Sequence, residues 1–190
     1  MSKEGAMSPR FLVAAVSILC SAFFFVGQPQ AADLTFFIGG VNPGTINIDD
    51  VKTALDGGPI FGFRLANNFV PAFGMEHTLA FSSDYLFPRS VSSIKEARGF
   101  VYNSNLILNI PAGKLVPYLT AGVGVVHQYG DRDMPVGTRF AYNYGGGVKL
   151  LRLAGPMGLR LDIRGYRIGA FSNQLNLLEI SGGVMLSLGK

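Results

Sequence analysis

Apolar and polar side chains alternate along most of the chain beyond residue 33, in segments that turn residues separate. An alternation with a period of two is typical of β-strands whose two faces meet different surroundings. No stretch in this part of the sequence is apolar for long enough to predict a membrane-spanning helix. The pattern therefore predicts eight strands. They lie at residues 33–41, 58–66, 71–85, 98–110, 115–129, 138–152, 158–171 and 174–189.

The connections between the predicted strands alternate in length, and only the last link breaks this rhythm. The long connections are 42–57, 86–97 and 130–137. The short connections are 67–70, 111–114 and 153–157. Tight turns on one side and long loops on the other are typical of an up-and-down meander whose two ends meet different surroundings. We therefore expect neighbouring strands to run antiparallel.

Odd and even positions sort most of the strands into a large apolar face and a small polar face. In the seventh strand, for example, Asp162 lies between Leu161 and Ile163. The fifth strand shows the alternation more weakly, and the faces of the first strand are ambiguous. The charged residues of the polar face are Arg64, Glu76, Lys149, Arg160, Asp162, Arg164 and Glu179.

Two kinds of barrel use strands of this pattern. A soluble barrel such as a lipocalin turns its apolar face inward, whereas a membrane barrel turns that face outward and pairs its charges inside. The polar face here carries mainly Asn, Ser, Thr and Gly rather than the many Lys and Glu of a water-facing surface. We therefore predict an all-β fold, an eight-stranded antiparallel up-and-down transmembrane β-barrel, with an interior that side chains just fill.

In such a barrel the charged residues form a network that fills the lumen. Arg160, Asp162 and Arg164 share one face of the seventh strand. Glu179 and Lys149 lie on the strands at its two sides, where opposite charges pair directly or diagonally. The residues expected to contact lipid include Leu161, Ile163, Val148, Ile180 and Val184.

The composition agrees with strands in apolar surroundings. Hydrophobic residues make up 48% of the chain and charged residues 15%, a balance that excludes intrinsic disorder. The 25 glycines accompany 15 Phe and 7 Tyr, a mixture that favours strands over helices. The net charge of +4 includes no run of Lys or Arg, so we expect no nucleic-acid partner.

The first residues carry the pattern of an export signal. Basic residues precede an apolar run at 11–26, and a membrane-spanning helix needs a longer run, of about 20 residues. We therefore predict a signal peptide at residues 1–32 and a barrel domain at residues 33–190; an uncleaved membrane anchor is the alternative. Cys20 is the only cysteine and lies in the signal, so the mature domain would contain no disulfide.

Residues 140–168 read FAYNYGGGVKLLRLAGPMGLRLDIRGYRI, and residues 117–124 read PYLTAGVG. These segments resemble the penultimate hairpin, and the strand before it, of the OmpA-like outer membrane β-barrel domain family. The resemblance extends over about residues 33–190 and implies an eight-stranded barrel in a bacterial outer membrane. It also implies contact with outer membrane lipids and lipopolysaccharide, and insertion by the barrel-assembly machinery.

Two features depart from that family. The sequence ends in LSLGK, without the terminal aromatic residue that the assembly machinery reads. It also contains no Trp, so Tyr and Phe must supply the aromatic girdles at the membrane interfaces.

The sequence holds no arrangement typical of an enzyme or a metal site. The only histidines, His77 and His127, form no His-x-Ser pair of the kind found in lipid A deacylases, and no His, Asp and Glu cluster has metal-ligand spacing. We therefore expect no catalytic residue, no cofactor and no metal. His77 falls on the apolar face near the middle of its strand, where a β-bulge or a place in an aromatic girdle would accommodate it.

Three functions stay open on these grounds. The first is a structural or surface-interaction barrel with a filled lumen and long loops outside the cell. The second is a small outer membrane channel gated by the charged network. The third is a soluble periplasmic lipocalin-like barrel with an apolar pocket. A need for detergent separates the third function from the others, and conductance in planar bilayers separates the first two.

Overall fold

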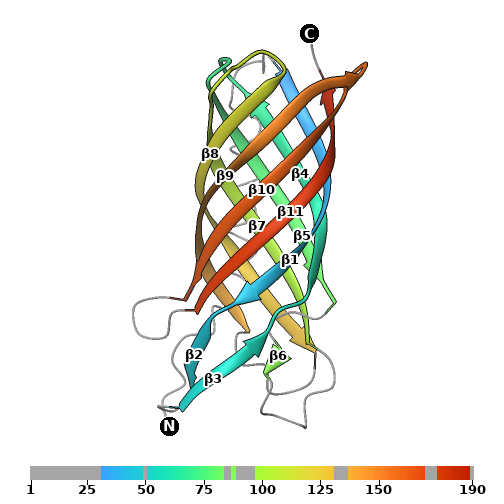
Figure 1. The fold of residues 1–190 in the computed structure, drawn as a ribbon. Coiled ribbons are helices and arrows are strands. Elements are labelled where there is room, and N and C mark those ends of the chain that lie inside the picture. The colour runs from blue at the N-terminus through green and yellow to red at the C-terminus, as the bar shows by residue number, and fades with distance from the viewer. Residues whose placement is uncertain are drawn as a thin grey trace.

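The computed structural model of the chain describes residues 31–48, 51–83, 87–88, 97–130, 137–169 and 175–188. Within these ranges eight of eleven strands close into one antiparallel barrel (Figure 1). The predicted signal peptide lies outside the described residues, except for its last two positions, which begin β1. The barrel strands are β1 (Ala31–Pro43), β4 (Pro59–Asn68), β5 (Phe73–Ser82), β7 (Ala97–Asn109), β8 (Leu115–Gly130), β9 (Thr138–Ala154), β10 (Met157–Ile168) and β11 (Leu175–Leu188).

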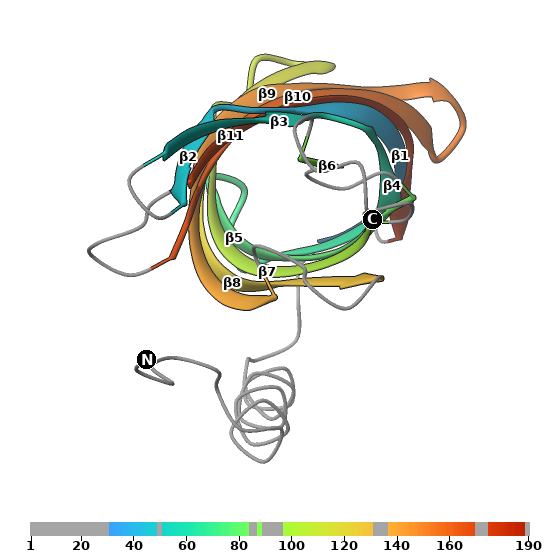
Figure 2. The same ribbon diagram turned by 90° about the horizontal axis from the view of Figure 1, so that it is seen from below.

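Each barrel strand pairs with the barrel strand before it along the chain, and β1 pairs with β11 to close the ring. The closing pair runs from Ala32 opposite Leu188 to Pro43 opposite Leu177 without a shift in register. Figure 2, a view from below, shows the strands as a ring. The predicted eight-stranded antiparallel up-and-down barrel is confirmed, and each strand lies close to its predicted segment.

The two ends of the barrel differ. Short turns at residues 69–72, 110–114 and 155–156 connect strands at one end, which we call the turn end. In the last of these turns Gly155 has a φ of 60°, a left-handed conformation that favours glycine, and Pro156 follows it. The opposite end, which we call the loop end, carries the longer connections (Figure 1).

A small three-stranded sheet extends the loop end. It consists of β2 (Thr45–Ile48), β3 (Val51–Asp56) and β6 (Phe87–Pro88). The prediction of a loop over 42–57 is therefore wrong in part, because β-branched residues in this segment favour a hairpin. Of the other predicted long loops, 86–97 and 130–137, residues 86, 89–96 and 131–136 lie outside the described residues.

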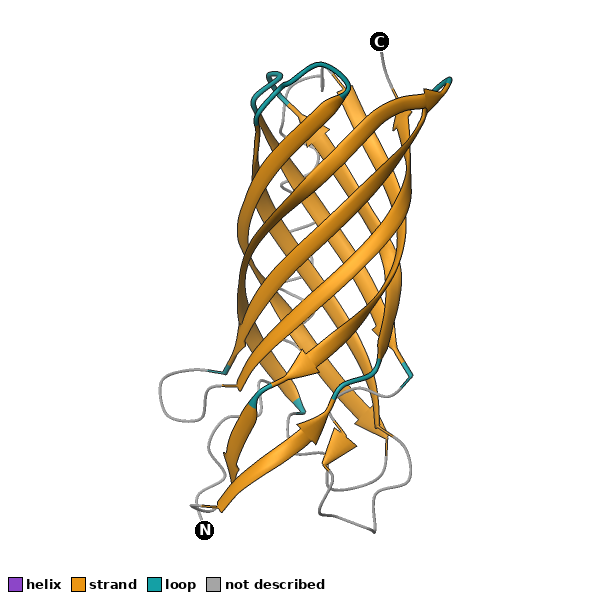
Figure 3. Cartoon of the chain, in the orientation of Figure 1, coloured by secondary structure: helices purple, strands orange, loops and turns teal. Residues whose placement is uncertain are grey.

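Strands make up most of the described chain (Figure 3). No helix long and apolar enough to span a membrane occurs among the described residues.

The outer face of the barrel is apolar, because side chains point alternately outward and inward along each strand. Large hydrophobic residues are exposed on most of the strands, with Leu161 68% and Ile180 58% exposed. Ile163 and Val184 also point outward, and Val148 is half-buried on the same face, as the sequence predicted. The residues predicted to contact lipid thus lie on the outside of the barrel.

The first strand, ambiguous in sequence, follows the same rule. Phe36 and Ile38 of β1 are exposed, whereas Asp33, Thr35 and Phe37 are buried inside the barrel. The inward residues include one charge and one aromatic ring, which blurs the alternation of polarity. The orientation of β1 is therefore clear only once its pairing with β4 and β11 is known.

Candidate functional site

The inner face of the barrel carries all seven charged side chains that the sequence assigns to the polar face. Each is buried, with at most 2% of its surface exposed. Six of them form a cluster that we call the ion network. Its members are Arg64 of β4, Glu76 of β5, Arg160, Asp162 and Arg164 of β10, and Glu179 of β11.

Asp162 is the centre of the ion network. Its Oδ2 accepts hydrogen bonds from Arg160 Nε at 3.0 Å and from Arg64 Nη1 at 3.2 Å. Its Oδ1 accepts one from Arg164 Nη2 at 2.9 Å. Tyr118 Oη donates to the same carboxylate. One carboxylate therefore contacts all three arginines of the network.

Glu76 joins β5 to two arginines of β10. Its carboxylate accepts hydrogen bonds from Arg160 Nη1 at 2.5 Å and from Arg164 Nη2 at 2.6 Å. Together with Asp162 and Glu179, it gives the network three carboxylates for three guanidinium groups. Burial of a charge is costly unless the charge is paired and hydrogen-bonded. The formally neutral network meets that condition.

Glu179 forms its ion pair over the inner face of β1, with a residue of the strand on the other side of β1. In the β10–β11 register it lies opposite Arg164, but its carboxylate pairs with Arg64 of β4. Tyr166 Oη donates to its other oxygen at 2.6 Å. The sequence pointed to partners on neighbouring strands, whereas here the partner lies on a strand that is not adjacent. An arginine can reach that far because the bore of an eight-stranded barrel is only as wide as side chains can fill.

Lys149 lies apart from the ion network. Its Nζ is 3.4 Å from Asp33 Oδ2 of β1 and 5.5 Å from the centre of the Tyr118 ring. Sequence reasoning missed Asp33 because the faces of the first strand were ambiguous. With Asp33 included, the described part of the lumen holds four buried basic and four buried acidic side chains.

Aromatic rings cover two of the arginines. The Arg64 guanidinium carbon lies 3.6 Å from the centre of the Phe37 ring, and that of Arg160 lies 4.6 Å from the centre of the Tyr118 ring. Such contacts stabilise a desolvated cation. Neither ring belongs to the polar face that the sequence predicts. Tyr118 could be identified from its even position on β8, because Thr120, two residues further along, faces inward.

Uncharged polar side chains line the wall that β7, β8 and β9 form. Asn105 and Asn143 exchange two hydrogen bonds, of 2.5 and 3.1 Å. Asn105 Nδ2 also donates to Thr120 Oγ1 at 3.0 Å. Closer to the turns, Asn109 donates to Asn68 at 3.0 Å. These hydrogen bonds connect neutral polar side chains along the wall, and the charged side chains lie in the ion network.

The inner face becomes apolar toward the loop end. On β4, Ile60 lies nearer the loop end than Arg64, and on β10, Ile168 lies nearer that end than Arg164. We call these buried residues the apolar layer, to which all eight barrel strands contribute. Its members are Phe37, Val41, Ile60, Ala80, Val101, Val126, Ala141, Tyr166, Ile168, Leu175 and Leu177. The expectation of a polar inner face is therefore wrong for this layer, although Ser82 and Gln128, nearer still to the loops, are buried polar residues.

His77 lies on the outer face, as its parity predicts. The β4–β5 and β5–β7 pairings run past it without a shift in register, which rules out the β-bulge. Its Nδ1 is 3.0 Å from Tyr102 Oη, and the two rings stack. His127 Nδ1 is 2.7 Å from Thr138 Oγ1. Among the described residues, no group of His, Cys, Asp and Glu could hold a metal ion.

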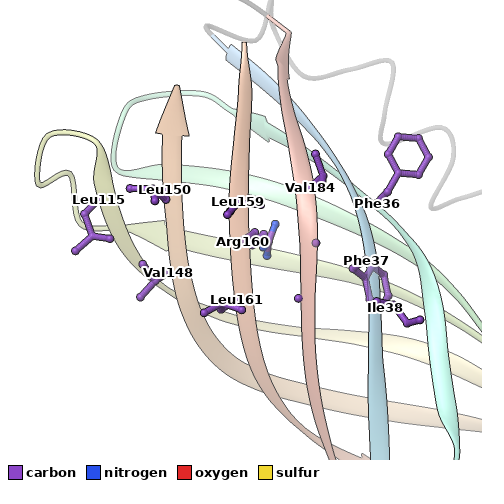
Figure 4. Close-up of a pocket in the computed structure, with 12 residues that line it drawn as sticks. Phe36, Phe37, Ile38, Leu115, Val148, Leu150, Leu159, Arg160, Leu161 and Val184 are labelled. Atoms are coloured by element: carbon purple, nitrogen blue, oxygen red, sulfur yellow. The ribbon is translucent and has the colours of Figure 1, made fainter. Parts of the chain in front are cut away.

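An apolar groove of about 660 Å³ runs along the outside of the barrel between β1 and β9 (Figure 4). Leu159, Leu161 and Val148 line it, and Gly182 contributes no side chain. Arg160 is the only charged lining residue, and its guanidinium belongs to the ion network inside. The groove therefore offers an apolar surface without a polar group to orient a ligand.

No family model matches the chain, and no curated protein matches its sequence. Solved structures do share its fold. Neisserial surface protein A superposes with a TM-score of 0.63 and 13% identity, covering 82% of this chain and 97% of that one. The outer membrane protein OprG of Pseudomonas aeruginosa gives a TM-score of 0.64 and 12% identity, covering 86% and 99%.

The N-terminal β-barrel domain of OprF, also from Pseudomonas aeruginosa, gives a TM-score of 0.53 and 14% identity, covering 84% of this chain and 98% of that domain. At these identities the likeness concerns the fold. The predicted resemblance to small eight-stranded outer membrane barrels is confirmed at that level.

Proposed function

We propose that this chain is a bacterial outer membrane β-barrel with a closed bore, which holds a loop region at the cell surface. The observation that carries this proposal is the filling of the bore. The ion network occupies its centre, and side chains from all eight strands form the apolar layer nearer the loops. Neither catalysis nor solute transport is part of this role.

The outer surface supports a place in the membrane. A soluble barrel would bury its largest apolar residues inside, whereas Ile38 and Leu161 here are each more than two-thirds exposed. In a membrane these side chains would contact lipid chains, and lipopolysaccharide would surround the outer half. Insertion would fall to the barrel-assembly machinery.

The two ends of the barrel suggest an orientation. Outer membrane barrels have short turns toward the periplasm and longer loops toward the outside. The turn end would accordingly face the periplasm, and the sheet of β2, β3 and β6 would face the outside. This sheet is the part of the described chain best placed to meet an external partner.

The apolar layer argues against the small channel. Ions lose their hydration when they enter an apolar constriction, so such layers close pores by excluding water. A charged network alone could rearrange into a gate, but the only polar side-chain group of the apolar layer is the Tyr166 hydroxyl, which already donates to Glu179.

Fractionation followed by bilayer recording tests the proposal. The chain should fractionate with outer membranes, resist extraction by carbonate, and change its gel mobility on heating as folded barrels do. In planar bilayers the purified protein should give no sustained opening of porin size. Recovery as a detergent-free soluble monomer would refute the membrane role, and stable porin-sized openings would establish the channel in its place.

A further inference from the structure

The apolar groove on the outside of the barrel has a gap at Gly182 (Figure 4). Leu161 and Ile38 lie on either side of this residue, and each is more than two-thirds exposed. A Cβ atom at Gly182 would have as its nearest neighbours the tip of the Leu161 side chain, at 3.2 Å, and the Arg160 carbonyl oxygen, at 3.8 Å. A side chain at this position would therefore project into the groove.

The groove lies in the half of the barrel nearest the turns. Its row of residues closest to the turn end is formed by Leu115, Leu150 and Leu159, which lie opposite one another on β8, β9 and β10. Leu115 directly follows the turn at residues 110–114. In the orientation proposed above, this half lies in the periplasmic leaflet of the outer membrane, so the inference rests on that proposal.

Two basic residues lie just beyond this end of the groove. Lys114 ends the turn before β8, and its carbonyl oxygen accepts a hydrogen bond from Leu151 N at 2.8 Å. Arg152 is the next residue of β9. Both basic residues are exposed, and neither forms an ion pair within the part of the chain that the structure describes. The three turns contain no Asp or Glu, so the turn end of the groove is positively charged.

A β-bulge holds Arg152 at this place. The β9–β10 register shifts between Met157 and Leu159, so that residues 151–153 of β9 face a single residue of β10. Arg152 has a φ of 53° and is the only non-glycine residue with a positive φ among the described residues. Bulges redirect side chains at the ends of strands, and a backbone conformation of this kind is found where the position of a side chain matters for function.

The combination of an apolar groove with positive charge at one end selects the ligand. Lysine and arginine both bind phosphate groups, and the groove volume of about 660 Å³ lies within the range of ligand sites, about 300–1,000 Å³. A second copy of the chain would fill the groove but would leave the two charges without an anion. We infer that the groove, Lys114 and Arg152 bind one anionic glycerophospholipid of the periplasmic leaflet, with an acyl chain in the groove and the phosphate at the basic residues.

Native mass spectrometry of the refolded full chain in detergent tests the charge. Phosphatidylglycerol and phosphatidylcholine with the same acyl chains are the two probes. The wild-type chain should retain one phosphatidylglycerol at concentrations at which phosphatidylcholine is lost. Lys114→Gln and Arg152→Gln should each weaken this retention about fivefold, the effect of one basic residue near anionic lipid. Arg167→Gln removes an exposed charge at the loop end and should have no such effect.

A second pair of variants tests the groove. Gly182→Leu places a side chain in the gap and should abolish retention of phosphatidylglycerol. Gly40→Leu is the matched control, because Gly40 is exposed on β1, lies outside the groove, and has no atom within 4 Å of its Cβ position. A change of gel mobility on heating shows whether each variant folds. If Gly182→Leu does not fold, the two charge variants decide.

Several outcomes would overturn the lipid site. They are equal retention of the two lipids by the wild type, unchanged retention in a folded Gly182→Leu protein, and displacement of the lipid by inorganic phosphate. A dimer that Gly182→Leu disrupts would make a second copy the occupant instead. The membrane role fails separately, because a chain that folds without detergent refutes that role, whereas a detergent-dependent barrel without a lipid preference refutes only this site.

Discussion

Arg64 and Glu179 form an ion pair inside the bore, although their strands do not pair with each other. Both neighbour β1, which separates them in the sheet. By its shorter route the backbone ladder connects β4 to β11 through β1, while the ion pair connects them directly through the interior. Asp162 and Glu76 extend the same arrangement to β10 and β5. The ion network thus braces the barrel from inside, independently of backbone hydrogen bonds.

Removal of Glu179 should destabilise the barrel. Glu179→Ala leaves the buried Arg64 without its carboxylate and Tyr166 Oη without its acceptor. Loss of one partner of a buried pair costs about 3–5 kcal/mol. Urea unfolding in detergent micelles measures the change, and Lys114→Ala, at the exposed turn end, is the control. A Glu179→Ala protein as stable as its parent would contradict a bracing role for the network.

The Asp33–Lys149 pair should behave as a unit. Asp33→Ala leaves a buried ammonium group without its carboxylate, and Lys149→Met leaves a carboxylate without its ammonium group. Each single change should therefore destabilise the barrel. The double variant should lose less than the sum of the two, with a coupling of about 0.5–3 kcal/mol. Unfolding free energies of the four proteins complete the cycle. Strict additivity would show that the two side chains do not interact.

The outer face should tolerate charge according to depth. Leu161→Arg places a cation near the middle of the apolar surface and should cost about 2–4 kcal/mol in a lipid bilayer. Leu153→Arg, equally outward but near the turn end, should cost about 0–1 kcal/mol. Reversible unfolding into vesicles compares the two. Equal costs would mean that residue 161 does not face hydrocarbon.

The apolar layer should control conductance. Leu177→Ser together with Ile168→Ser introduces hydroxyls into the layer, lets water enter, and should produce small unitary openings that the parent lacks. Leu178→Ser, on the adjacent outward position, is the matched control and should stay silent. Planar bilayer recordings of all three proteins give the answer. Silence of the double variant would assign the barrier to the ion network instead.

Several features of this protein follow from the sequence alone. A period of two along a strand fixes which side chains share a face, whatever the partners of that strand. The eight barrel strands and the inward direction of Asp162, Glu179 and the other charges are local properties of this kind. The outward position of Leu161 and Ile180 follows in the same way.

Only the tertiary structure determines which inward-facing side chains meet and how deep in the bore they lie. Parity places Arg64 and Glu179 inside but does not say that they meet, because 115 residues separate them and the closure of the ring sets their distance. It leaves Asp33 ambiguous until β1 has neighbours on both sides. It also cannot give depth in the bore. Depth depends on the register and tilt of the strands. These place residues that are far apart in the sequence, such as Ile60 and Leu177, in one layer.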